Sequence, residues 1–257
     1  MFKISILLTS ILLLVSSSGD AKTLTFGMVD WCPYTCDKSK VQKEGYAAEA
    51  LRKILEPEGY KVNFWILPFP RAIEFARLGQ INGLVTSTEQ ESPGFVFTKR
   101  SMGVYAMSFF TRKESTWRFK GLKTIDVIDK IGIVKSYDYG EPEFMKLTKT
   151  KPEKFVTITD SNTIHRLVKM LSRKRIDAMI ESEHVLKFQL KETDSAEQIR
   201  YAGTLAPPSP FYTALSPNLS ISKQLRKTID EGMDRLRKSG ELAKICRDYG
   251  FDIWEDK

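Results

Sequence analysis

Residues 45–64 read GYAAEALRKILEPEGYKVNF, and the order of local patterns in this stretch sets the fold class. Apolar residues recur there at helical spacing, at positions Ala47, Ala50, Leu51 and Ile54. Pro57 and Gly59 end this helical pattern, and the apolar run 62–67 that follows is typical of a buried strand. A helix that leads directly into a strand is part of a βαβ unit, so the stretch predicts an α/β protein with parallel strand pairing.

The same alternation extends in both directions along the chain. Strands are expected at 24–29, 62–67, 81–86, 131–134, 155–158 and 176–180, with helices between most of them. A strand-like run at 105–110 and a proline-rich segment at 204–212 connect two α/β units, and two crossings form a hinge. We therefore expect lobe 1 to comprise 22–108 and 209–257, lobe 2 to comprise 109–208, and the C-terminal helices to pack on lobe 1.

The N-terminal residues 1–21 have the pattern of a cleavable export signal. Lys3 precedes an apolar run at 4–15, and small residues, Gly19 and Ala21, stand at the expected cleavage site. The apolar run is shorter than the roughly 20 residues needed to cross a bilayer as a helix. We expect a mature chain that begins at Lys22 and is located in the periplasm.

Composition and charge indicate an ordinary globular protein that does not bind nucleic acid. The chain has 257 residues, of which 42% are hydrophobic and 28% charged, as in an ordinary globular protein. Lys and Arg (40) exceed Asp and Glu (32), which gives a net charge of +8, but no block of five like charges occurs. Proteins that bind nucleic acids usually concentrate their basic residues. The charge therefore predicts a solvated basic surface and no nucleic-acid partner.

The cysteines indicate a disulfide rather than a metal site. Cys32 and Cys36 can pair in an oxidising compartment and would fix one loop. A zinc site would need a second pair of ligands, whereas His165 and His184 lie far along the chain with no cysteine beside them. Cys246 lies among apolar residues at helical spacing and is expected to be buried. We expect neither a metal nor a cofactor.

Five sequence strings, in a fixed order, resemble a known family. They are residues 45–64 quoted above, FPRAIEFARLGQINGLV (69–85), FVFTKRSMGVY (95–105), KIGIVKSYDYGE (130–141) and RLRKSGELAKICRDYGF (235–251). In this order the strings are similar to the extracellular solute-binding proteins of family 3, which deliver polar amino acids to ABC importers. The resemblance implies a two-lobed, type II periplasmic-binding-protein-like fold. Each lobe would contain a mixed, mostly parallel sheet flanked by helices.

The resemblance also implies a monomer that closes on a small polar solute and then docks on an ABC permease or a membrane sensor. Amino-acid binders of the family usually carry an Arg six residues before the position matched by Phe97, where it holds the carboxylate of the ligand. This chain has Glu91 at that position. The acidic anchor for the ammonium group of the ligand falls near Ser182, between Glu181 and Glu183. The usual α-amino-acid clamp is therefore incomplete.

Candidate ligand contacts follow the ends of the expected strands, where sites form in open α/β sheets. The candidates are Trp31, Tyr34, Phe69, Arg71, Ser87, Thr88, Glu91, Ser136, Tyr137, Tyr139, Ser161 and Glu181. Arg71 could hold an anionic group or pair on the surface with Glu74 or Glu89. The aromatic residues could cover a planar ligand or belong to the core, and Ser161 could simply cap a helix.

Three functions are compatible with this sequence. The first is a periplasmic receptor whose lobes close on a solute for an ABC importer, without covalent chemistry. The second is an enzyme on the same scaffold, similar to a periplasmic dehydratase, with Glu91 or Glu181 as a general acid. The third is a sensory module that presents its solute to a membrane kinase or cyclase. We expect the first function.

Overall fold

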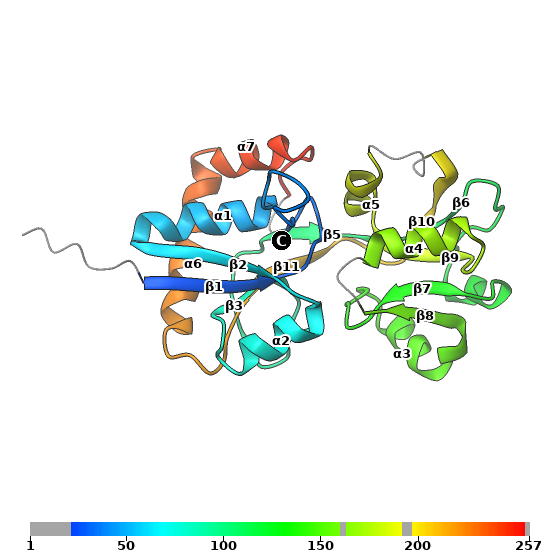
Figure 1. The fold of residues 1–257 in the computed structure, drawn as a ribbon, viewed down its shortest axis with the longest axis horizontal. Coiled ribbons are helices and arrows are strands. Elements are labelled where there is room, and N and C mark those ends of the chain that lie inside the picture. Colours follow the sequence, from blue (N-terminus) through cyan, green and yellow to red (C-terminus); the bar gives the residue numbers. More distant parts are fainter. Residues whose placement is uncertain (1–21, 160–162, 192–196, 255–257) are drawn as a thin grey trace, which may run out of the picture.

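Two β-sheets flanked by helices make up the computed structural model, which describes residues 22–159, 163–191 and 197–254 (Figure 1). The strands are β1 (Lys22–Met28), β2 (Tyr60–Ile66), β3 (Gly83–Ser87), β4 (Val96–Phe97), β5 (Gly103–Tyr105), β6 (Met107–Arg112), β7 (Ile131–Val134), β8 (Phe155–Ile158), β9 (Ala178–Ser182), β10 (Ile199–Thr204) and β11 (Ser209–Leu215). The helices are α1 (Tyr46–Leu55), α2 (Phe69–Arg77), α3 (Pro142–Thr150), α4 (Thr163–Ser172), α5 (Glu183–Leu190), α6 (Ser222–Lys238) and α7 (Glu241–Asp248).

The two sheets define two lobes. Lobe 1 contains strands in the order β2-β1-β3-β11-β4, with β5 paired to β11, and helices α1, α2, α6 and α7. Lobe 2 contains strands in the order β10-β6-β9-β7-β8 and helices α3, α4 and α5. β1 pairs in parallel with β2 and β3, and β7 pairs in parallel with β8 and β9. The predicted two-lobed α/β fold with mostly parallel central strands is confirmed.

Two adjacent segments connect the lobes. The chain leaves lobe 1 between β5 and β6 and returns between β10 and β11. The backbone N–H of Leu205, on the returning segment, donates to the carbonyl of Met107 at 2.8 Å. The strand expected at 105–110 is in fact interrupted at Ala106. Tyr105 pairs with Ser209 in lobe 1, whereas β6 pairs with β9 in lobe 2. The strand is interrupted because its two halves belong to different sheets. The residue limits given above for the lobes stay a prediction.

Helix α1 shows how the sequence pattern of residues 45–64 determines the local structure. Its predicted apolar face, which includes Leu51 and Ile54, is fully buried. α6 packs closely against this face. The approach is so close that a Cβ atom at Gly232 would lie 2.3 Å from Ile54 Cγ2. Cys246, in α7, is buried as predicted. The C-terminal helices therefore complete the core of lobe 1.

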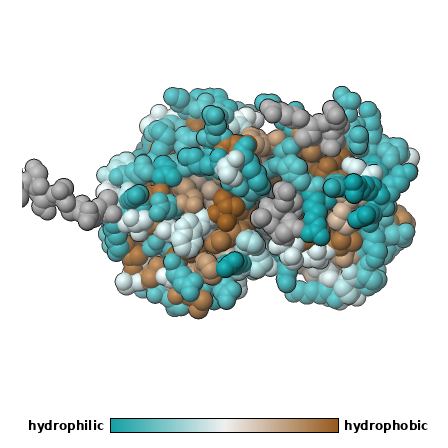
Figure 2. All heavy atoms as spheres, viewed as in Figure 1, coloured by the Kyte–Doolittle hydropathy of each residue, from teal (hydrophilic) through white to brown (hydrophobic). Residues whose placement is uncertain are grey.

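The visible surface is mostly hydrophilic (Figure 2), as expected for a chain in which 28% of the residues are charged. Hydrophilic residues dominate the face shown in Figure 2, and hydrophobic residues appear among them in smaller groups. Within the described ranges, no helix is both long enough and apolar enough to cross a membrane. The predicted export signal, residues 1–21, lies outside the described residues.

Candidate functional site

A small, partly open cavity lies between the two lobes. Lobe 1 contributes Val29, Trp31, Phe69, Thr86, Ser87, Thr88, Glu91, Tyr105 and Phe211, and lobe 2 contributes Met107, Tyr137 and Asp138. Most of these residues stand at or just after the carboxyl ends of parallel strands β1, β2, β3 and β7. Ligand sites of open α/β sheets form at this edge, so the topology and the cavity indicate the same site.

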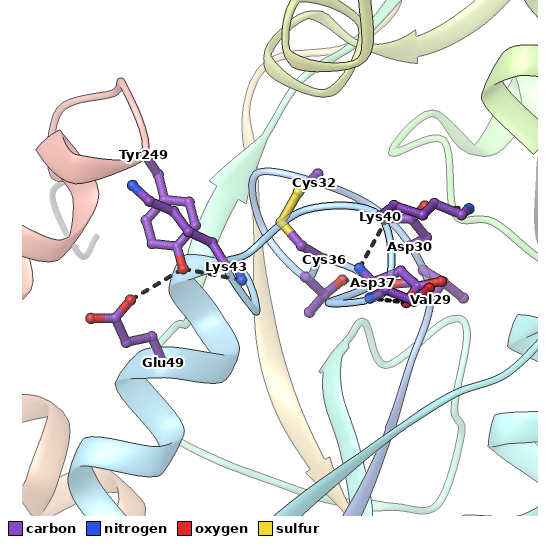
Figure 3. The surroundings of a disulfide bond; sticks show 12 residues. Val29, Asp30, Cys32, Cys36, Asp37, Lys40, Lys43, Glu49 and Tyr249 are labelled. Atoms are coloured by element: carbon purple, nitrogen blue, oxygen red, sulfur yellow. Dashed lines mark hydrogen bonds and ion pairs between the residues drawn. A yellow bond between two sulfur atoms is a disulfide. The ribbon is translucent and has the colours of Figure 1, made fainter.

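The loop after β1 carries Trp31 into the cavity. A disulfide closes this loop (Figure 3). Cys32 and Cys36 are bonded, as the sequence predicted. Trp31 and Thr35 form an isolated antiparallel bridge, in which the N–H of Trp31 donates to the carbonyl of Thr35 at 2.7 Å. The Asp30 carboxylate also pairs with Lys40 at 2.8 Å. The loop that presents Trp31 is therefore held by covalent and polar contacts together.

Aromatic side chains form most of the apolar wall. They are Trp31, Phe69, Tyr105, Tyr137 and Phe211. The ring of Trp31 lies 5.9 Å from Tyr105, 6.4 Å from Tyr137 and 5.8 Å from Phe211, in each case edge to face. Phe69 and Tyr137 meet at 6.0 Å, also edge to face. These rings pack against one another around the cavity, so this wall can enclose a compact solute.

Glu91 connects the two lobes across the cavity. Its Oε2 accepts a hydrogen bond from the N–H of Thr88 in its own lobe at 2.9 Å. Its Oε1 accepts from the N–H of Asp138 in lobe 2 at 3.0 Å. The hydroxyl of Thr88 donates to Asp138 Oδ2 at 3.1 Å. These contacts require that the lobes be together, so the structure is a closed form.

Glu181 lies behind Trp31 at the end of β9 and is fully buried. Its Oε1 accepts from Trp31 Nε1 at 2.8 Å and from the N–H of Ser182 at 2.7 Å. Its Oε2 is buried without a hydrogen-bond partner among the described residues. The contact with Trp31 is a second polar connection between the lobes, and it fixes the orientation of the indole ring.

Burial alters the protonation of both glutamates. It raises the pKa of Glu181 from 4.5 to about 7, although the hydrogen bonds from Trp31 and Ser182 act in the opposite direction. Burial also raises the pKa of Glu91 to about 7, against the hydrogen bonds from the N–H groups of Asp138 and Thr88. Both carboxyl groups can therefore exchange protons near neutral pH.

Six of the residues predicted from sequence line the cavity together. They are Trp31, Phe69, Ser87, Thr88, Glu91 and Tyr137. Tyr34 and Glu181 lie one layer behind. The Tyr34 hydroxyl is within 3.2 Å of both Ser182 Oγ and His184 Nδ1, so Tyr34 helps to hold the lobes together rather than lining the space.

The other predicted residues are placed differently. Arg71 is exposed and lies over the ring of Phe75, because α2 buries the face that carries Phe69 and Ala72 instead. Ser136 is exposed with a positive φ of 66° and is outside the cavity lining. The Tyr139 hydroxyl accepts from the N–H of Val134 within lobe 2 at 2.6 Å, so it supports the loop from inside. Ser161 lies outside the described residues.

Sequence reasoning missed six lining residues: Val29, Thr86, Tyr105, Met107, Asp138 and Phe211. Asp138 stands between two residues that were named, in the string SYDY, and its charge could have identified it. Tyr105, Met107 and Phe211 belong to the connecting strands, which appeared in the sequence only as a hinge. Nowhere in the described ranges do three or more His, Cys, Asp or Glu residues gather in a way that could hold a metal ion.

The family is shown by a match over most of the chain. Residues 24–252 match the model of the bacterial extracellular solute-binding proteins, family 3. The chain belongs to this family. The probable amino-acid-binding protein YxeM of Bacillus subtilis (strain 168) is 23% identical to this solute-binding protein over 239 residues, which are 91% of this chain and 86% of YxeM.

Solved structures share the fold of this solute-binding protein at low sequence identity. An ancestral arginine-binding protein bound to arginine has a TM-score of 0.75 and 18% identity, covering 91% of this chain and 100% of that chain. A histidine kinase sensor domain with similarity to periplasmic binding proteins has a TM-score of 0.76 and 17% identity, covering 91% of this chain and 98% of that domain. These likenesses confirm the two-lobed architecture.

Proposed function

We propose that this solute-binding protein captures one small polar solute between its lobes and presents the closed form to an ABC importer. The observation that carries this proposal is the cavity whose walls come from both lobes, bridged by the contact between Glu91 and the backbone of Asp138. Export through residues 1–21 would place the protein outside the cytoplasm, where an importer could receive the solute. The description of YxeM as an amino-acid-binding protein supports a solute of amino-acid size.

Closure would work as a shift in population. A solute in the cavity would touch Trp31 and Thr88 in lobe 1 and Tyr137 in lobe 2 at the same time. Contacts that exist only when the lobes are together stabilise the closed form relative to the open form. We propose binding without covalent change, because binding and closure alone account for delivery to a transporter.

The first test is a thermal-shift screen of the mature chain, 22–257. A solute at one hundred times its Kd should add about 2.7 kcal/mol to the free energy of unfolding. For a chain of this size that corresponds to a rise in Tm of roughly 5–10 °C. The panel should contain amino acids, amines, organic acids and small sugars. If no member of any class shifts the Tm, the receptor function is wrong.

A further inference from the structure

The cavity contains acidic groups and no basic group. Glu91 and Asp138 are on its wall, and none of its twelve described lining residues is Lys, Arg or His. This is unlike the chain as a whole, whose net charge is +8. A solute that carried a carboxylate into this space would meet two like-charged groups and no counter-ion, at distances where partial burial makes repulsion strong.

Two backbone donors beside the cavity that could hold an anion are already occupied. The N–H groups of Thr88 and Asp138 both donate to the carboxylate of Glu91, at 2.9 and 3.0 Å. The hydroxyl of Thr88 donates to Asp138. The chain therefore supplies its own carboxylate to these donors. A carboxylate on the solute would have to displace Glu91 from contacts that also bridge the lobes.

The aromatic wall favours the opposite charge. Five aromatic residues line the cavity beside the two carboxyl groups, and a cation over an aromatic ring is attracted by the negative face of the ring. The indole N–H of Trp31 donates to Glu181, which makes the face of this ring more negative. The aromatic rings and the carboxylates therefore both attract a positively charged group.

We propose that the solute is a small organic cation without a carboxylate group, held by the carboxylates of Glu91 and Asp138 and by the aromatic rings of the cavity. The inference rests on the proposed function and adds the chemical class of the solute. Amines, guanidines and quaternary ammonium compounds belong to this class. An α-amino acid does not, because its carboxylate would meet no basic group among the described lining residues.

The test compares pairs of probes that differ in the carboxylate group. Suitable pairs are agmatine with arginine, putrescine with ornithine, histamine with histidine, and choline with glycine betaine. Binding to the mature chain is measured by isothermal titration calorimetry at pH 8, where Glu91 is mostly ionised. We expect at least one cation to bind, and to bind more than tenfold more tightly than its carboxylate partner.

Variants connect the preference to the residues. Glu91→Gln keeps the shape of the side chain and removes its charge, so it should weaken binding of the cation at least tenfold. Glu89→Gln is the matched control, because Glu89 is exposed two residues away, and it should leave the affinity unchanged. Asp138→Asn provides a second test if Glu91→Gln disturbs folding, which circular dichroism would reveal.

The outcomes separate this inference from the proposed function. Tighter binding of the carboxylate partner in the pairs, or binding only of neutral or anionic solutes from the wider panel, would overturn the cationic class and leave a working receptor. Cation affinity that is unchanged in both Glu91→Gln and Asp138→Asn would also overturn it. Absence of binding by every class of solute would overturn both proposals.

Discussion

Replacing Glu181 by glutamine is expected to stabilise the protein at pH 8 by up to about 3 kcal/mol. The carboxyl group is fully buried, and one of its oxygens has no hydrogen-bond partner among the described residues. Burial raises its pKa from 4.5 to about 7, and each pKa unit corresponds to about 1.4 kcal/mol. Ionising this group in the folded state therefore costs roughly 3 kcal/mol. A neutral amide of the same shape avoids this cost, but its buried NH2 group has no acceptor in the described part of the chain, which offsets part of the gain.

The sign of the pH dependence follows from proton binding. Between pH 4.5 and 7 the folded state keeps a proton on Glu181 that the unfolded state releases. The unfolded state binds fewer protons there, so the free energy of unfolding falls as pH rises through this window and levels off above about pH 7. The difference between Glu181→Gln and the natural chain should therefore be less than about 1 kcal/mol at pH 4.5 and largest at pH 8.

Urea denaturation at several pH values measures this effect directly. The control is Glu183→Gln, because Glu183 is a half-exposed neighbour paired with Lys187, and loss of such an ion pair should change stability little. Burial lowers the pKa of His184, which therefore acts in the opposite direction, while the charge of Glu183 raises it. His184 and Glu183 are both unchanged in Glu181→Gln, so this contribution cancels in the difference between that variant and the natural chain. If the difference between Glu181→Gln and the natural chain does not grow between pH 4.5 and pH 8, Glu181 is not a buried, destabilising acid.

Replacing Gly103 by alanine is expected to cost several kcal/mol of stability and to abolish solute binding. Gly103 lies in β5, and a Cβ atom there would be 1.9 Å from the hydroxyl of Tyr46 and 2.4 Å from the ring of Phe211. Both side chains are nearly fully buried, so neither can move freely. Overpacking of a core commonly costs about 1–3 kcal/mol and sometimes more. Displacement of Phe211 would also narrow the cavity that it lines.

The explanation can be checked by removing the atoms that clash. Tyr46→Phe removes the hydroxyl and Phe211→Leu shortens the other side chain, so the triple variant should recover part of the lost Tm. Gly94→Ala is a useful comparison, because no atom lies within 4 Å of its Cβ position and only the positive φ of 83° opposes it. Thermal unfolding should rank Gly94→Ala above Gly103→Ala in stability. Equal losses would mean that overpacking at Gly103 is not the cause.

The position of the cavity could be predicted from the sequence, but the directions of its side chains could be predicted only in part. Trp31, Phe69, Thr88, Glu91 and Tyr137 follow strand ends in the sequence, and the cavity contains all of them. Strand ends can be located from apolar runs, and parallel pairing brings them to one edge. The direction of each side chain is a different matter, because it depends on which face of an element packs on the core.

Arg71 shows this limit most clearly. It follows the second strand, where an anion-binding residue could stand, yet α2 turns it to the solvent. Asp138 was passed over in the sequence, although it lies beside Tyr137 and contacts both Thr88 and Glu91. A position one residue along a helix or loop changes the direction of a side chain by a large angle, and the sequence pattern alone did not resolve it.

Local features of the chain were enough to predict the alternation of strands and helices, the two α/β units, the Cys32–Cys36 disulfide and the family. Each of these depends on spacing within about 20 residues or on strings that can be compared directly. The charge of the cavity depended on packing. Glu91 meets the backbone of Asp138 across 47 positions of the chain, and Trp31 meets Glu181 across 150. Such contacts form because the two lobes close on each other. The spacing of residues within one segment does not determine which residues of the other lobe it will meet.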